Sequence, residues 1–225
     1  GILSTGDELV PVETEPGPAQ VRGINCFTLS ALTIQYGACP VDFGTVRDSA
    51  RQIRESLERA IASTDLTAIA GGSSVGTQDL TLEVIQSFDN ARILAHGLAI
   101  RPGKPTILAR VGNKPVIGLP GHPVSAIIVF SILAKTIIHR LVSYSDELYS
   151  HRGVRARISR NVASASGRED YLRVSLVTEN GQLVAQPLPG ESGAISTLIQ
   201  ADGLVRIPLE KEGLEAGEIV EVELF

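Results

Sequence analysis

Hydrophobic and polar residues alternate with two different periods along the first two thirds of the chain. Short apolar runs of strand length are separated by segments in which apolar residues recur with the period of a helix. Such alternation is typical of βαβ units and predicts a mainly parallel sheet up to about residue 145. We expect strands at 1–4, 39–46, 66–70, 91–100, 106–111 and 115–118, and helices at 25–37, 49–63, 80–88 and 124–141.

Two of these helices carry more specific signals. In the segment 49–63, Arg51 and Glu55 are spaced to pair across one turn. The apolar residues that share one face of this segment are Ala50, Ile53, Leu57, Ala60 and Ile61. In the segment 25–37, Asn25 is expected to cap the helix from its first position.

The remaining residues, from about 150 onward, show the period of two that is typical of short strands. We expect strands at 154–158, 171–177, 183–187 and 218–224. A single helical segment is expected at 193–200, followed by a turn at 201–203. The pattern therefore predicts a small β-rich domain after the α/β part of the chain.

Composition narrows the class of protein. The 225 residues carry a formal net charge of −5 with a pI near 5.4, which argues against a nucleic-acid or anionic-membrane binder. Two cysteines, Cys26 and Cys39, suggest neither a disulfide scaffold nor a zinc site, so that a reducing cytoplasm fits best.

The most apolar stretch and the start of the chain give two further expectations. The stretch 124–138 is interrupted by Ser131 and Lys135, and we expect it to be too short to span a membrane. The first residues fall inside an expected strand, and the chain has no methionine. We therefore expect N-terminal sequence to be missing.

A glycine-rich segment is the strongest chemical signal. The expected strand 66–70 leads into Gly71-Gly-Ser-Ser-Val-Gly-Thr-Gln-Asp79. Glycines let backbone N–H groups converge on an anion, and a helix starting just beyond adds its positive end, so phosphate is the expected ligand. The segment is neither a Walker loop nor a Rossmann fingerprint. A tight turn with Asp79 as an ordinary first-turn carboxylate is the alternative.

Three further polar segments follow expected strands. They are 4–8 (Ser-Thr-Gly-Asp-Glu), 47–48 (Arg-Asp), and the pair 101–104 (Arg-Pro-Gly-Lys) with 119–125 (Leu-Pro-Gly-His-Pro-Val-Ser). Ligands of open α/β sheets bind outside the carboxyl ends of the strands. Carboxylates, backbone donors and cations at this edge would suit metal-assisted chemistry on an anionic group.

These motifs, in this order, resemble one known family. Ser4-Thr-Gly-Asp-Glu-Leu9, Gly71-Gly-Ser-Ser-Val-Gly76 with Asp79, Arg101-Pro-Gly-Lys-Pro105 and Gly118-Leu-Pro-Gly-His-Pro-Val-Ser-Ala126 are similar to those of the molybdopterin molybdenumtransferases, called MoeA in bacteria. The family is related to the E domain of gephyrin and its plant counterpart. The resemblance implies a three-layer α/β molybdopterin-binding domain at 1–147 and a small β-barrel-like domain at 148–225.

The resemblance also implies an activity. Family members convert adenylylated molybdopterin and molybdate into molybdenum cofactor and AMP with a divalent cation, usually Mg²⁺, and they are homodimers. Molybdate is a tetrahedral dianion like phosphate, so cations must hold two anionic partners together against their repulsion. We expect a cytoplasmic enzyme of molybdenum cofactor biosynthesis without nucleic-acid or membrane partners.

Roles are assigned to residues by their motif positions. Asp79 is expected to hold the divalent cation or to orient the attacking oxygen, and Glu8, with Asp7 beside it, to join the metal or molybdate environment; solvated turn carboxylates are the alternative. Asp48 is the third expected catalytic carboxylate, or else the N-cap of the helix 49–63. Arg101 and Lys104 would contact phosphate or molybdate, unless they belong to a basic surface loop. The other expected substrate-binding residues are Thr5, Gly6, Asn25, Gly71, Gly72, Ser73, Ser74, Gly76, Pro120, Gly121, Pro123 and Ser125.

Three positions depart from the family pattern. His122 stands where the family usually has Asn, and Ser73 stands where Val is common. Gly23 lies two residues before Asn25, where the family generally has an Asp. These changes bear on substrate preference rather than on the place of the pocket.

Two other functions stay open: a CinA-like nucleotide or pterin phosphohydrolase or deamidase, and a non-catalytic molybdopterin-binding or scaffold module. The motif 101–105 and the C-terminal β domain argue against the first, and the retained Asp79, Glu8 and Lys104 against the second.

Overall fold

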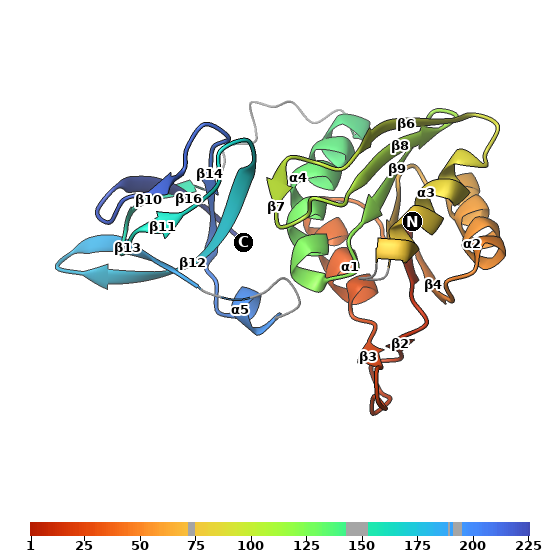
Figure 1. Cartoon of the computed structure of the whole chain (residues 1–225), viewed down its shortest axis with the longest axis horizontal. Coiled ribbons are helices and arrows are strands. Elements are labelled where there is room, and N and C mark those ends of the chain that lie inside the picture. Colours follow the sequence, from red (N-terminus) through yellow and green to blue (C-terminus); the bar gives the residue numbers. More distant parts are fainter. Residues whose placement is uncertain (72–74, 143–152, 189, 191–194) are drawn as a thin grey trace. The chain divides into compact units, whose positions relative to one another are not determined.

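The chain forms two compact units (Figure 1). The computed structural model describes residues 1–71, 75–142, 153–188, 190 and 195–225, and for 75–79 it describes the backbone alone. Unit 1 comprises Gly1–Leu98 and Pro105–Tyr144, and unit 2 comprises Ala99–Lys104 and Ser145–Phe225. The domain boundary expected near residue 147 lies outside the described residues and stays a prediction. The segment Ala99–Lys104 belongs to unit 2, although unit 1 flanks it in the sequence.

Unit 1 is built on a six-stranded sheet. Its strands, in spatial order, are β4 (Asp42–Val46), β1 (Ile2–Thr5), β5 (Thr67–Ala70), β9 (Lys114–Leu119), β8 (Ile107–Val111) and β6 (Ala91–His96). The first four run parallel to one another, and the last two extend the sheet in antiparallel pairs. The mainly parallel sheet expected from the hydrophobic pattern is confirmed.

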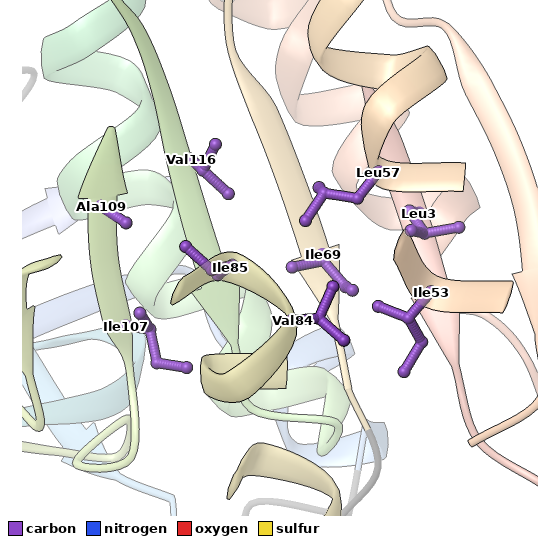
Figure 2. Packing of buried hydrophobic residues seen from close by; sticks show 9 residues of the cluster. All are labelled: Leu3, Ile53, Leu57, Ile69, Val84, Ile85, Ile107, Ala109 and Val116. Carbon is purple, nitrogen blue, oxygen red and sulfur yellow. The ribbon is translucent and has the colours of Figure 1, made fainter. Parts of the chain in front are cut away.

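Helices cover both faces of this sheet and make three layers (Figure 1). On one face α1 (Asn25–Gln35) packs against α4 (Pro123–Leu141), and on the other α2 (Ala50–Ser63) packs against α3 (Val75–Gln86). Figure 2 shows the core beneath the second pair, which the strands and helices fill together. Its fully buried members include Leu3, Ile53, Leu57, Ile69 and Ile85. Each such side chain stabilises the fold by about 1.5–3 kcal/mol relative to exposure.

The helix α2 illustrates how the sequence pattern becomes packing. Ile53, Leu57 and Ala60 are completely buried at helical spacing, as expected. Arg51 Nε donates to Glu55 Oε1 over 2.8 Å on the exposed side, in the predicted pair. Ala50 was expected on the buried face but is exposed, because it is the first residue of the helix.

The helix α4 ends at Leu141, as expected, and begins one residue earlier than expected, at Pro123. With 19 residues and a mean hydropathy of 1.7 it has the length and composition to cross a membrane, so the expectation that it is too short was wrong. Half of it is buried inside unit 1, where Tyr36, the C-cap of α1, stacks on Phe130 with ring centroids 6.3 Å apart. The Tyr36 hydroxyl also donates to Ser131 Oγ over 2.9 Å. This packing is that of a core helix.

Unit 2 is a closed five-stranded barrel. Its strands, in order, are β13 (Gln182–Pro187), β10 (Gly153–Ile158), β16 (Ile219–Leu224), β14 (Gly203–Ile207) and β12 (Glu169–Glu179), and β12 pairs with β13 to close the ring. The β-barrel-like domain is thereby confirmed. A sixth strand, β7 (Ile100–Arg101), pairs with the start of β12. Unit 2 also contains β11 (Val162–Ala163), α5 (Ser196–Ile199) and β15 (Gly213–Leu214). In unit 1, β2 (Leu9–Val10) pairs with β3 (Val21–Arg22).

Candidate functional site

The carboxyl ends of the four parallel strands of unit 1 lie at one edge of the sheet. The chain leaves β1 for β4 on one side of it and then returns to β5 on the other, which is where open α/β sheets bind ligands. Gly71, directly after β5, donates its N–H to Leu119 O over 3.2 Å. A Cβ on Gly71 would lie 3.4 Å from both Thr5 and Thr81 side chains. The loop after β5 therefore begins in close contact with the ends of β1 and β9.

A buried hydroxyl joins the ends of β1 and β4. Thr5 is fully buried, and its Oγ1 donates to Asp48 Oδ1 over 2.7 Å, with Arg47 O 3.4 Å away. The N-cap of α2 is Ser49, so the alternative assignment of Asp48 as helix cap was wrong. The Asp48 side chain instead connects two neighbouring strands at the edge where ligands bind.

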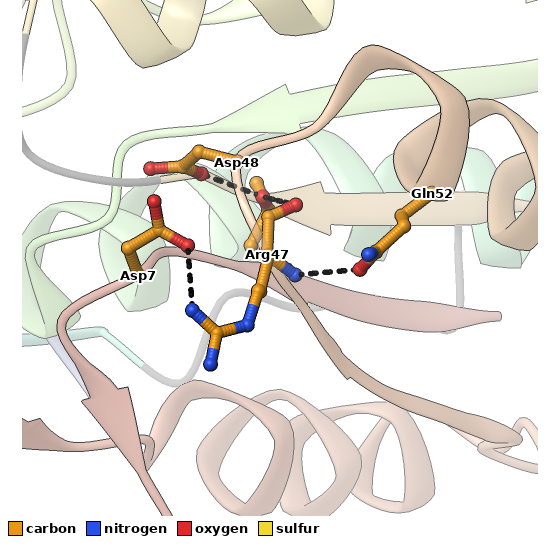
Figure 3. Close-up of polar contacts among 5 residues, drawn as sticks. Asp7, Arg47, Asp48 and Gln52 are labelled. Carbon is orange, nitrogen blue, oxygen red and sulfur yellow. Dashed lines mark hydrogen bonds and ion pairs between the residues drawn. The ribbon is translucent and has the colours of Figure 1, made fainter.

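Two further carboxylates follow β1. Asp7 Oδ1 lies 3.9 Å from Arg47 Nη1, and both side chains are exposed, so this ion pair contributes little stability (Figure 3). The carboxylate of Glu8 lies over Gly6. A Cβ on Gly6 would lie only 2.8 Å from Glu8 Oε2. Among the side chains that the structure describes, which do not include Asp79, no three His, Cys, Asp or Glu residues lie close enough together to hold a metal ion.

Asn25 connects the starts of α1 and α4. Ile24 is the N-cap of α1 and makes no side-chain cap bond, so the expected capping by Asn25 was wrong. Asn25 instead donates its Nδ2 to Gly121 O over 2.9 Å. This bond fixes the amide orientation, because the flipped amide would place an oxygen against that carbonyl. The buried Oδ1 has no hydrogen-bond partner among the described residues.

The loop after β9 forms a rigid start for α4. His122 is the N-cap and Pro123 the first helical residue, where proline lacks an N–H that would in any case be unpaired. Pro120 and Ser125 are buried. The structure thus brings together five of the expected substrate-binding residues: Asn25, Pro120, Gly121, Pro123 and Ser125.

The other expected residues divide into two groups. Gly72, Ser73 and Ser74 lie outside the described residues, while Gly76 and Asp79 are placed by backbone only, in the first half of α3. Arg101 and Lys104 belong to unit 2, where Arg101 Nη1 lies 3.9 Å from Asp170 Oδ2. Sequence reasoning missed Asp170, because the pairing of β7 with β12 leaves no local signal.

Cys26, in the first turn of α1, is a thiol with an unexpected environment. Its Sγ lies 3.3 Å from Asp42 Oδ2 and donates to it. Burial first, and then the hydrogen bond and charge of Asp42, raise the pKa of the Cys26 thiol to about 11. A helix N-terminus alone would lower a thiol pKa, so burial and the carboxylate dominate here.

This shift predicts slow alkylation of Cys26. The folded pKa exceeds the ordinary 9.0, so the associated stability is present below pH 9 and is lost as the pH rises through 11. At pH 8 the thiolate fraction is about 100-fold below that of an ordinary thiol. We expect the Cys39→Ser variant, which retains Cys26, to react with iodoacetamide about tenfold or more slowly than Cys26→Ser. Equal rates would contradict the contact between the half-buried Cys26 thiol and Asp42.

Asp48 offers a test that separates structure from chemistry. Asp48→Ala leaves the buried Thr5 hydroxyl without its best acceptor, and we expect a loss of about 1–3 kcal/mol in the free energy of unfolding. Asp48→Asn retains an acceptor oxygen, so we expect most of the stability to remain in urea unfolding. If Asp48 also serves catalysis, Asp48→Asn lowers turnover despite normal stability; full activity in that variant would leave Asp48 a structural role alone.

Comparison with known proteins identifies the class. Residues 1–140 match the model of a probable molybdopterin binding domain, and residues 155–225 match that of the MoeA C-terminal region (domain IV). The first match covers most of unit 1 and places its three-layer fold in the class of probable molybdopterin binding domains. Because both regions are present in this order, the chain belongs to the MoeA family.

Individual relatives agree over the whole chain. A putative molybdopterin biosynthesis protein of Methanocaldococcus jannaschii is 31% identical over 100% of this chain and 54% of its own length. A molybdopterin molybdenumtransferase of Nostoc is 31% identical, with 97% of this chain and 51% of the relative covered. The crystal structure of a MoeA protein from Pyrococcus horikosii matches with a TM-score of 0.84 at 34% identity, covering 99% of this chain and 53% of that one. The chain therefore spans about half the length of these relatives.

Proposed function

We propose that this chain carries the molybdate-insertion site of a molybdopterin molybdenumtransferase. In this reaction, adenylylated molybdopterin and molybdate give molybdenum cofactor and AMP, and the phosphoanhydride bond breaks. The observation that carries the proposal is that the segments after β1, β4, β5 and β9 begin at one edge of the sheet, where Thr5 contacts Asp48, and that Asn25 bonds to Gly121 in the segment after β9. The names of the relatives support the same step.

The proposed roles follow from position. The loop that begins at Gly71 and the start of α3 would bind the phosphate groups through backbone N–H donors. Asn25 and the loop from Pro120 to Pro123 would form the adjoining wall, which their mutual hydrogen bond makes rigid. Arg101 and Lys104 of unit 2 would supply cations for phosphate or molybdate.

A magnesium ion would bind at Glu8 with Asp79. Mg²⁺ usually takes one or two carboxylates and completes its shell with water and substrate phosphates, so a larger protein cluster is not required. The oxygen-only donors after β1 fit that preference. When bound, the ion would neutralise charge on the phosphoanhydride.

The protein around this site is proposed to be a cytoplasmic homodimer that handles small molecules and binds neither nucleic acid nor membrane. The net charge of −5 supports the absence of a polyanionic partner. No observation favours the CinA-like or the scaffold function over the transferase.

The decisive experiment measures AMP release from adenylylated molybdopterin with Mg²⁺, with and without molybdate. Molybdate-dependent release, with a product that activates an apo-molybdoenzyme, would establish the transferase. Release without any dependence on molybdate would instead support the phosphohydrolase. Substrate binding without release would support a binding module.

A further inference from the structure

A carboxylate of unit 2 holds the cationic segment that the proposed function needs. The strand β7 runs parallel to β12, with Arg101 beside Asp170 and Ile100 beside Glu169. The N–H of Glu169 donates to Ala99 O over 2.8 Å, which extends this pairing. A short piece of chain from between two segments of unit 1 is thereby fixed along the barrel.

Side-chain contacts of Asp170 add to the backbone pairing of β7 with β12. Asp170 is nearly buried, with 11% of its side chain exposed, and its Oδ1 accepts from Arg168 Nε over 2.9 Å. Its other oxygen lies 3.9 Å from Arg101 Nη1. One negative charge therefore faces two guanidinium groups, and 64% of the Arg101 side chain remains exposed.

We propose that Asp170 is a positioning residue, which holds Arg101 ready to receive a tetrahedral oxyanion without touching that anion itself. A free arginine side chain loses rotamer entropy when it captures a ligand. A guanidinium already restrained by a neighbouring carboxylate loses less, so its affinity for the anion is higher. This inference rests on the proposed function only for the identity of the oxyanion as molybdate or a substrate phosphate.

The sign of the effect distinguishes positioning from simple charge. Removing a negative charge beside an anion site strengthens binding if Asp170 acts only through its field. Removing it weakens binding if Asp170 acts by orienting Arg101. Asp170→Asn keeps the size of the side chain and an acceptor for Arg168, so the variant changes mainly the charge.

Glu169 supplies the matched control from the next position of β12. Its carboxylate accepts from Arg206 Nε over 3.0 Å and from the Tyr171 hydroxyl over 3.0 Å. Glu169→Gln removes the same charge from the same strand but leaves the pair of Asp170 and Arg101 in place. We expect its affinity for molybdate to equal or slightly exceed that of the wild type.

The experiment measures molybdate binding by equilibrium dialysis and the KM for molybdate in the AMP-release assay. We expect Asp170→Asn to weaken binding by about 2- to 10-fold, the effect of ordering one side chain, with KM rising more than kcat falls. In an Arg101→Ala background, Asp170→Asn should have no further effect on binding. Unchanged or tighter binding in Asp170→Asn, while the wild type turns over, would overturn the inference and leave the proposed function standing.

A second readout needs no substrate. The Nε–H signal of Arg101, followed by NMR relaxation, should indicate greater side-chain motion in Asp170→Asn and not in Glu169→Gln. Equal order in all three proteins would overturn the positioning role, whatever the enzyme does. If the wild type neither binds molybdate nor releases AMP while Arg101 loosens as expected, the proposed function fails and the anion part of the inference fails with it.

Discussion

The Asp79→Asn variant is expected to lose molybdate-dependent AMP release while it remains folded. Asp79 lies in the first half of α3, directly beyond the glycine-rich loop that follows β5. Asparagine matches its shape but cannot neutralise a cation or accept a proton. We expect turnover to fall by about 10²- to 10⁴-fold, the range for a positioned acid–base group. The measurement is single-turnover AMP release, with circular dichroism to verify the fold.

A matched variant on the same part of the chain tests specificity. Asp89 is exposed just beyond the end of α3, and Asp89→Asn removes an equal charge far from the ends of the parallel strands. We expect normal turnover there. Wild-type rates in Asp79→Asn would exclude the assignment of Asp79 as catalytic, and equal losses in both variants would point to a general effect of charge instead.

The sequence predicted the fold of unit 1 well, because local hydrophobic periods carry most of the information there. The burial of Ile53 and Leu57 follows directly from the helical spacing of α2. In unit 2, the period of two identified β10, β12, β13 and β16. The closure of the barrel by β12 and β13 depends on pairing that periodicity alone does not encode, and the expected barrel came from family resemblance.

The sequence predicted where the candidate site lies, but it did not predict the contacts within the site. Motifs after β1, β4, β5 and β9 converge because parallel strands share a carboxyl edge. The bond between Thr5 and Asp48 was not predictable, since residue 48 beside an expected helix reads as a cap. Asn25 was misassigned for the same reason: its amide bonds to Gly121, 96 residues away, rather than to its own helix. Long-range contacts of short polar side chains leave no periodic trace.

The barrel depends on one close approach between strands, which gives the prediction with the largest expected effect on stability. Gly203 begins β14 and pairs with Leu224 of β16 and with Val174 of β12. A Cβ at this position would overlap the carbonyl oxygen of Glu223 and lie 2.8 Å from Val222 Cγ1. Because a backbone oxygen cannot move without separating β14 from β16, we expect Gly203→Ala to cost about 3 kcal/mol or more, the upper range for overpacking.

Gly153→Ala is the control, because it adds the same methyl group to the same barrel. Its nearest neighbours would be atoms of the flexible Glu221 side chain, which can rotate away toward solvent. We expect this variant to lose under about 1 kcal/mol, as is usual where a neighbour can move. Urea unfolding gives the free energies, and hydrogen exchange of the β14 and β16 amides locates the change. If Gly203→Ala proves as stable as Gly153→Ala, β14 and β16 do not approach as closely as the structure places them. That result would contradict the pairing of β14 within the closed barrel.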